Sequence, residues 1–185
     1  MDEEKTFMGL DLSLQDTGVA VMKGNEMQTF DIMTKPDQFE HSLLRVNAIA
    51  NKVMGYIEQF KPNMIVMEDY FVGKNPRPII NLIELGSIVR YKILTSGGSF
   101  FTVTPQSLKK FCHGKGAGGK ELVLKGVYKK WNLDVNNNNL ADAIVLAYIS
   151  KALYNELNKI PQDLLGYEKE VVTNVTTNRK LISRI

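Results

Sequence analysis

The sequence predicts one α/β domain with a mixed sheet of five strands flanked by helices, and three observations support this. A chain of 185 residues has the length of one domain that buries a core of its own. Its 44% hydrophobic and 23% charged residues are ordinary globular values. Short apolar runs typical of strands alternate with longer stretches of helical periodicity, in the order βββ-α-β-α-β-α.

The N-terminal part predicts an antiparallel meander. Residues 7–14 and 19–22 have the apolar and β-branched composition of two short strands. Residues 15–18, Gln-Asp-Thr-Gly, are typical of the turn between them. A third short strand is expected over residues 27–32, after a Lys-Gly-Asn turn.

The middle of the chain predicts two helices and two buried strands. Apolar residues recur at three- and four-residue steps over 39–60, which indicates an amphipathic helix. The continuous apolar run 64–67 is typical of a buried parallel strand. Pro78 to Thr95 predicts a helix that is apolar around most of its circumference and therefore covered on two sides. The second side is either the core of the same chain or a partner subunit. Residues 99–103 predict another strand.

The C-terminal part predicts three more helices. A short one extends through Leu108, and the four glycines of residues 113–119 then predict a loop. Helices are expected over 120–131 and 140–157, the second after a cap-like run of asparagines. Residues 1–158 would form the functional domain, and 159–185, which have weak periodicity, an extension or tail.

The composition excludes several classes of protein. A single cysteine, Cys112, excludes an internal disulfide framework, and with only two histidines a zinc-hydrolase centre is not expected. No apolar run approaches the ~20 residues that span a bilayer. The acidic N-terminus does not resemble a signal peptide. We therefore expect a cytoplasmic protein without membrane contact.

Three acidic residues occupy unusual places in this pattern. Asp11 interrupts the apolar first strand, Glu68 ends the run 64–67, and Asp142 lies at the start of the last long helix. Buried carboxylates are costly unless they are paired or bind a cation. If the first and fourth strands are neighbours, the three carboxylates converge, and Mg²⁺ prefers such hard oxygen ligands. Asp69 alternates away from Glu68 and is expected to face elsewhere.

Lysines are concentrated in one segment of the chain. Between Lys109 and Lys130 there are seven lysines and one acid, Glu121. Such a cluster neutralises phosphates and supplies sequence-independent affinity for nucleic acid. A solvated helix face explains the same pattern without any ligand.

Four motifs resemble the RuvC family of Holliday-junction resolvases, in particular its shorter phage-borne relatives. They are similar to the family's first strand and turn, its strand and dimer helix, its basic glycine loop and its acidic last helix. In order, they are GLDLSLQDTG (9–18), IVMEDYFVGKNPRPIINLIELG (65–86), VTPQSLKKFCHGKGAGGKELV (103–123) and NNLADAIVLAY (138–148). The resemblance covers about residues 5–155 and implies a ribonuclease-H-like mixed five-stranded sheet.

The resemblance also implies roles for individual residues. Asp11, Glu68 and Asp142 would be metal ligands in a crossover junction endonuclease, together with the residue at position 139. Two Mg²⁺ ions would be bound, with Mn²⁺ as a substitute. Lys120 would stabilise charge at the cleaved phosphate. Branched DNA would contact an aromatic side chain that stacks on bases and several cations: Phe71, Lys74, Arg77, Lys109, Lys110, Lys115 and Lys120. Phe71 is equally suited to a place in the core.

Two further properties follow from the resemblance. The helix Pro78–Thr95 would form a homodimer, so that two active sites face two strands of a roughly two-fold junction. No nucleotide cofactor is expected, and a phage-encoded protein would act in the cytoplasm of its bacterial host.

Asn139 departs from the family's pattern. The family usually has an acidic or metal-binding residue three positions before its last Asp, and here that residue is Asn139. Positions i and i+3 share a helix face, so the amide oxygen remains a possible ligand, but it adds no negative charge. The asparagine is either native, with weaker metal affinity, or an inactivating replacement.

Three alternatives stay open from the sequence. GLDLSLQDTG also resembles the phosphate-binding turn of sugar kinases and actin-like ATPases, although those proteins need a second similar domain. A different ribonuclease-H-like nuclease, acting on flaps or RNA–DNA hybrids, would use the same metal chemistry. A junction-binding protein that has lost catalysis is the third, and Asn139 is its main support.

Overall fold

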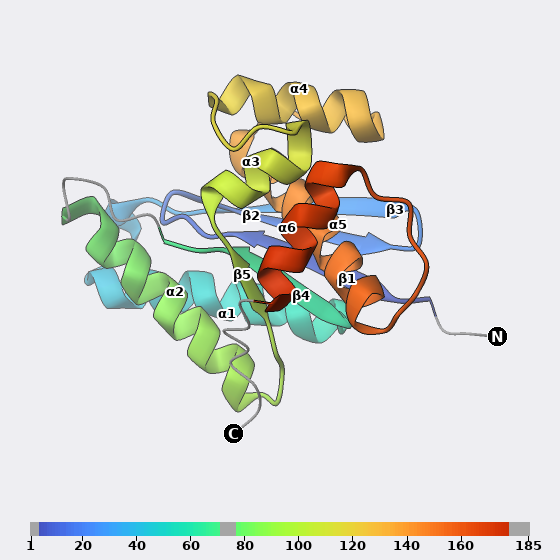
Figure 1. Cartoon of the computed structure of the whole chain (residues 1–185). Helices are drawn as coiled ribbons and strands as arrows, with labels where there is room; N and C mark the ends of the chain where they lie inside the picture. Colours follow the sequence, from blue (N-terminus) through green and yellow to red (C-terminus); the bar gives the residue numbers. More distant parts are fainter. Residues whose placement is uncertain (1–3, 71–76, 178–185) are drawn as a thin grey trace.

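A mixed sheet lies between two layers of helices (Figure 1) in the computed structural model, which describes residues 4–70 and 77–177. The strands are β1 (Thr6–Asp11), β2 (Asp16–Lys23), β3 (Glu26–Met33), β4 (Met64–Glu68) and β5 (Phe101–Val103). The helices are α1 (Ser42–Phe60), α2 (Arg77–Thr95), α3 (Pro105–His113), α4 (Lys120–Trp131), α5 (Asn138–Leu157) and α6 (Gly166–Thr177), with a 3₁₀ turn at Pro36–Gln38. The α/β architecture predicted from the sequence is confirmed.

The order of the strands brings the ends of β1 and β4 together. The sheet has the order β3-β2-β1-β4-β5, in which β1 pairs antiparallel with β2 and parallel with β4. Leu10 lies opposite Met67 in the parallel pair. The residues that follow them, Asp11 and Glu68, are therefore at the same edge of the sheet.

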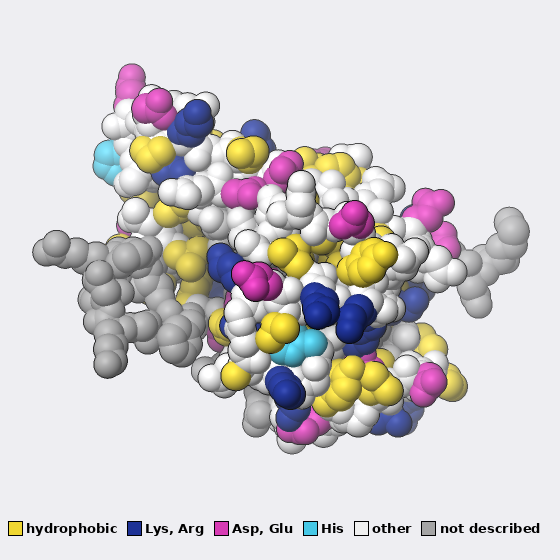
Figure 2. Space-filling model, turned by 90° about the horizontal axis from the view of Figure 1, so that it is seen from above, with side chains coloured by type: hydrophobic (Ala, Val, Ile, Leu, Met, Phe, Trp, Pro, Cys, Tyr) yellow, Lys and Arg dark blue, Asp and Glu magenta, His cyan; other side chains and the backbone are white. Residues whose placement is uncertain are grey.

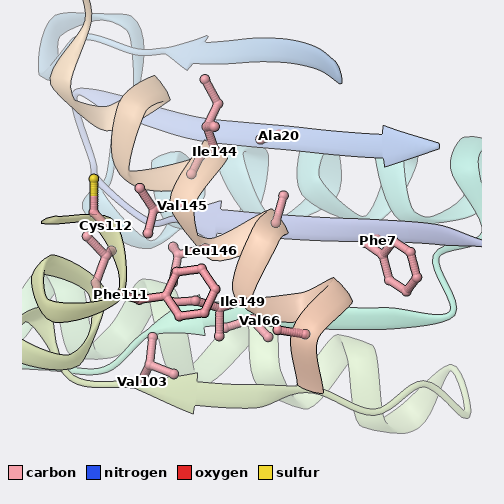
Figure 3. Packing of buried hydrophobic residues seen from close by; sticks show 14 of the residues in the cluster. Phe7, Ala20, Val66, Val103, Phe111, Cys112, Ile144, Val145, Leu146 and Ile149 are labelled. Carbon is pink, nitrogen blue, oxygen red and sulfur yellow. The ribbon is translucent and has the colours of Figure 1, made fainter. Parts of the chain in front are cut away.

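One face of the sheet is covered by α5, with α3, α4 and α6 around it. The buried side chains of this layer extend along α5 over β1, β2 and β4 (Figure 3). α5 lies directly on β1, because a Cβ at Gly9 would be 2.1 Å from the carbonyl oxygen of Ala143. Glycine at this position allows the close approach, and so sets how near the start of α5 comes to the end of β1.

The other face is covered by α1 and α2. Met8 and Leu10 of β1 pack there with Ile49 of α1 and Leu85 of α2. None of the helices within 4–70 and 77–177 is long and apolar enough to cross a membrane.

Several segments differ from the sequence prediction: β2 begins at Asp16, inside the turn expected over 15–18, and α3 extends to His113 and not only to Leu108. β1 ends at Asp11 and not at residue 14, because Ser13 and Thr17 exchange hydrogen bonds that form a turn: the Ser13 amide donates to Thr17 Oγ1 at 3.0 Å. α6 was not predicted, since residues 159–185 were expected to be an extension or tail. Val171 and Val172 of α6 are buried in the same cluster as α5, and this packing stabilises a helix of weak periodicity.

Candidate active site

Three carboxylates meet at the edge of the sheet where β1 and β4 end. Asp11 is the last residue of β1, Glu68 is the last residue of β4, and Asp142 lies one turn into α5. Each offers an oxygen atom within 4.8 Å of the other two. The convergence expected from the sequence is therefore present.

Asparagines hold the start of α5 against the sheet. The side-chain oxygen of Asn137 caps α5 by accepting from the amides of Asn139 at 2.8 Å and Leu140 at 3.3 Å. The amide nitrogen of Asn137 donates to Asp16 Oδ2 at 2.7 Å, and that of Asn139 donates to the Asp16 carbonyl at 2.6 Å. Both bonds join α5 to the first residue of β2, so the height of Asp142 above the sheet is fixed.

Burial raises the pKa values of all three carboxyl groups, and repulsion between carboxylates adds to this for Asp11 and Asp142. Burial raises the pKa of Asp11 well above its ordinary value, and the charges of Glu68 and Asp142 raise it further. Burial, and then the charge of Glu68, raise the pKa of Asp142 to about 7. Burial also raises the pKa of Glu68, against the opposing effects of its hydrogen bond with Asp11 and of the charges of Lys109 and Lys120. A cluster that is costly to ionise alone is one that a divalent cation stabilises.

A cavity of about 480 Å³ opens onto the carboxylates. It is lined by all three acids, two lysines, Asn139 and residues of the β1–β2 turn, α2 and α3: Asp11, Leu12, Ser13, Leu14, Gln15, Glu68, Leu82, Pro105, Lys109, Lys120, Asn139 and Asp142. Hard oxygen donors next to the ammonium groups of lysines fit a divalent metal ion and a phosphate group. A second cavity, of about 530 Å³, lies beside Trp131 and Tyr148, and its lining contains none of these three acids.

Residues 7–150 match the family model described as crossover junction endodeoxyribonuclease RuvC. The chain belongs to the RuvC family. The family is dependent on divalent metal, and the carboxylate cluster fits that dependence.

Individual RuvC proteins are similar over different shares of the chain. A crossover junction endodeoxyribonuclease RuvC from Helicobacter pylori is 31% identical over 93 residues, which are 49% of this chain and 59% of that protein. The chain thus spans less than two thirds of the length of that relative. A RuvC from Campylobacter concisus is 24% identical over 147 residues, 76% of this chain and 92% of that protein.

A solved structure shares the fold. The structure described as Thermus thermophilus RuvC in complex with Holliday junction substrate has a TM-score of 0.69 and 20% sequence identity. The match covers 83% of this chain and 96% of that chain. The ribonuclease-H-like sheet expected from the motifs is therefore confirmed.

The lysine segment divides into paired and unpaired cations. Lys110 forms an ion pair with Glu170, and Lys130 forms one with Glu168, so α6 neutralises two of the seven. Among the described residues, the other lysines between 109 and 130 form no ion pair within 4.0 Å: Lys109, Lys115, Lys120, Lys125 and Lys129. Basic and apolar side chains intermingle on the face seen from above α4 (Figure 2).

The other residues singled out from the sequence have different surroundings. Lys115 is exposed in the loop between α3 and α4 and does not line the cavity. Phe71 and Lys74 lie outside the described residues, and of Arg77 only its place as the first residue of α2 is described. Asp69 faces away from Glu68, as expected, and forms an ion pair with Arg90 at 3.1 Å.

Arg45 is a residue that the sequence reasoning missed. This buried arginine of α1 donates from Nη2 to the carbonyl oxygens of Leu14 at 2.7 Å and Thr34 at 2.9 Å. It therefore holds the turn whose residues Ser13 and Gln15 line the cavity. The signal in the sequence was a single arginine beside Val46 on the buried side of a helix, which is too common a feature to identify a role.

Proposed function

We propose that the chain is a structure-selective endonuclease that nicks four-way (Holliday) junctions and other branched DNA by metal-assisted hydrolysis of a phosphodiester. The observation that carries the proposal is the group of three carboxylates, Asp11, Glu68 and Asp142, within 4.8 Å of one another in a RuvC-family chain. Lys109 and Lys120 line the same cavity. Negative ligands for a cation and positive ligands for a phosphate thus share one site.

Asp11, Glu68 and Asp142 would hold Mg²⁺, with Mn²⁺ as a substitute, and two ions would be bound with the help of Asn139. Bound divalent ions activate water and stabilise the leaving oxygen of a phosphodiester. The amide nitrogen of Asn139 already donates to the Asp16 carbonyl. Its Oδ1 is therefore the atom available to a cation or to water.

Lys109 and Lys120 would hold the phosphodiester over the carboxylates. They come from two elements, since Lys109 is in α3 and Lys120 is the first residue of α4. Their charges lower the pKa of Asp142 against the larger effect of burial, so they act on the carboxylates electrostatically. The same charges stabilise the negative charge that develops on the phosphate during hydrolysis.

The chain would act as a homodimer through α2. Ile80, Ile83 and Tyr91 of this helix are exposed, with 54%, 37% and 68% of their surface accessible. They lie at positions i, i+3 and i+11 of one helix, so they share one side of it. A large exposed apolar surface on a helix is typical of a protein interface. A two-fold partner would present a second site to the opposite strand of the junction.

A nicking assay on a synthetic four-way junction tests the proposal. The wild-type chain is compared with Asp11→Asn in Mg²⁺ and in Mn²⁺, with forks, flaps, RNA–DNA hybrids and linear duplex as other substrates. Asp11→Asn is expected to lower the rate about a hundredfold or more, because a ligand to the cation is lost. Asp69→Asn is the matched control, since Asp69 is adjacent to Glu68 but pairs with Arg90.

Three results would contradict the proposal in different ways. Equal nicking by wild type and Asp11→Asn would remove the carboxylates from the reaction. Preference for hybrids over junctions would favour another ribonuclease-H-like nuclease. Junction binding without nicking in either metal would favour a binding protein that has lost catalysis, for which the neutral Asn139 is the supporting observation.

A further inference from the structure

α6 carries a buried carboxylate, Glu168, and this helix lies in a part of the chain that the match to the family model does not include. The match to the family model ends at residue 150, whereas α6 covers Gly166–Thr177. Only 5% of the surface of Glu168, in the first turn of α6, is exposed. Its Oε2 accepts from the Leu165 amide at 2.6 Å, and its Oε1 forms an ion pair with Lys130. A charge buried in this way needs its partner, because removal of one member leaves the other uncompensated.

Lys130 joins three helices through one ammonium group. It lies in the last turn of α4 and pairs with Glu168 of α6. Its Nζ also donates to the carbonyl oxygen of Phe111 at 2.7 Å. Phe111 is in the last turn of α3, where carbonyl groups lack partners within the helix. The Nζ is 4.9 Å from the ring centroids of Phe111 and Trp131 and 5.4 Å from that of Tyr167, distances at which cations are attracted to aromatic faces.

The loop between α3 and α4 does not hold the two helices in place by itself. It contains four glycines between His113 and Lys120, and glycine gives a backbone little preference for one conformation. The helices instead touch directly, since a Cβ at Gly126 of α4 would be 2.5 Å from the sulfur of Cys112 in α3. The ring of Tyr167 from α6 packs against Gly114, where the loop begins. Contacts among α3, α4 and α6 therefore decide where the loop and its flanking lysines lie.

These helices carry the two lysines of the active-site cavity. Lys109 precedes Phe111 by two residues in α3, and Lys120 is the first residue of α4, which has Lys130 in its last turn. A shift of α3 against α4 would move the two ammonium groups relative to each other and to the carboxylates. We propose that Glu168 is a positioning residue whose ion pair with Lys130 holds α3 and α4 so that Lys109 and Lys120 stay over Asp11, Glu68 and Asp142. This inference rests on the nuclease activity proposed above.

The chain offers a matched control for this ion pair. Lys110 and Glu170 also join α3 to α6, but their side chains are 31% and 56% exposed, against 20% and 6% for Lys130 and Glu168. Exposed ion pairs contribute little to stability. Glu170→Gln therefore removes the same kind of charge from the same helix without disturbing the buried contact.

The experiment compares Glu168→Gln and Glu170→Gln in the full chain. Nicking of a four-way junction is measured at saturating protein in Mg²⁺, junction affinity by fluorescence anisotropy without metal, and folding by circular dichroism at the assay temperature. Glu168→Gln is expected to lower the saturated rate about tenfold, since a displacement of about 1 Å has effects of this order or larger. Its junction affinity is expected to stay within about twofold, because neither Glu168 nor Lys130 lines the cavity and a displacement of Lys109 and Lys120 acts most on the charge that develops in the transition state. Glu170→Gln is expected to match wild type in both.

Hydrogen exchange supplies a readout that does not need cleavage. Peptides that cover 109–120 are expected to exchange faster in Glu168→Gln, whereas β1 and β4 keep their wild-type rates. If Glu168→Gln does not fold, the double variant Lys130→Met/Glu168→Leu replaces it, because it leaves no unpaired buried charge but still removes the bond to the Phe111 carbonyl. Lower rate and faster local exchange are expected for it too.

Two results would overturn the positioning role. One is a folded variant with unchanged saturated rate and unchanged exchange over 109–120. The other is a loss of junction affinity with an unchanged saturated rate, which would make Lys130 a DNA contact. Absence of nicking by the wild type would contradict the proposed nuclease activity instead, and the exchange measurement would still decide whether the ion pair orders the loop.

Discussion

α5 and α2 have similar apolar sequences, yet the chain buries residues on every side of α5 and on one side only of α2. α5 buries residues around its whole circumference, and even Ser150 is enclosed and donates to the Met64 carbonyl. α2 buries Leu85, Val89 and Ile93 against the sheet but exposes 68% of Tyr91. An apolar circumference therefore indicates that a helix is covered on two sides, without telling which molecule provides the second cover.

In the function that we propose, the two faces of the sheet have separate tasks. The α5 face carries Asp142 together with the lysines of α3 and α4, and it is the face to which α6 adds its buried carboxylate. The α2 face contributes Leu82 to the rim of the cavity and exposes Ile80, Ile83 and Tyr91, with the polar residues Asn81 and Ser87 between them. Nicking and dimer formation are therefore tested separately, because a substitution on one face of the sheet is expected to leave the other face unchanged.

The largest expected effect is on assembly. Ile80→Glu combined with Ile83→Glu is expected to raise the dissociation constant of the dimer about a hundredfold or more, since buried charges without partners replace apolar contacts. Analytical ultracentrifugation would show a species near the 20.9 kDa mass of one chain in place of a dimer. Leu122→Glu is the control, because Leu122 is also exposed and apolar but lies on α4. A wild-type chain that is already monomeric at micromolar concentration would contradict the dimer.

The sequence was sufficient to predict the mixed sheet and the convergence of the three carboxylates at its edge. Asp11 interrupts one apolar run and Glu68 ends another, and parallel neighbouring strands place their carboxyl ends at one edge of the sheet. The register of β1 with β4 was beyond the sequence, because the pattern of apolar residues does not give the pairing of two strands, nor the close approach of α5 to β1 at Gly9. The partners of the lysines were also beyond it, since Lys110 and Lys130 pair with residues 60 and 38 positions away, in a helix that the periodicity did not reveal.

A smaller effect is expected from a charge added to the α5 face. Asn139→Asp is expected to lower the Mg²⁺ concentration needed for half-maximal nicking about tenfold, because a further carboxylate at the cavity attracts the cation. The same change removes the donor to the Asp16 carbonyl. The metal-free variant is therefore expected to melt at a lower temperature than wild type, since a buried acceptor loses its partner.

A matched substitution separates the charge from its position. Asn136→Asp adds the same charge three residues earlier, in the loop before α5, at an exposed residue that does not line the cavity. It is expected to leave the Mg²⁺ titration unchanged. If Asn139→Asp also left the titration unchanged, Asn139 would not belong to the metal site.

The smallest expected effect is a dependence of the free energy of unfolding on pH, which arises from the carboxyl group of Asp142 in α5. The folded chain holds a proton on Asp142 up to about pH 7, whereas the unfolded chain releases it near pH 4. The folded state therefore binds more protons between these values, and the free energy of unfolding of the metal-free protein decreases as pH rises from about 4 to 7. The raised pKa of Asp11 acts in the same direction.

Thermal melts in EDTA between pH 5 and pH 8 measure this dependence. The midpoint is expected to fall with rising pH, and Asp142→Asn is expected to make that fall smaller by about 3 °C, since the amide has no proton to release. Mg²⁺ binds the ionised carboxylates, so its stabilising effect is expected to grow over the same range. The Ile80→Glu/Ile83→Glu variant tests the separation of the two faces, because it leaves the carboxylates in place and is expected to keep the wild-type slope. A melting midpoint of Asp142→Asn that falls as steeply as that of wild type would mean that the proton taken up on folding is not at the carboxylate cluster.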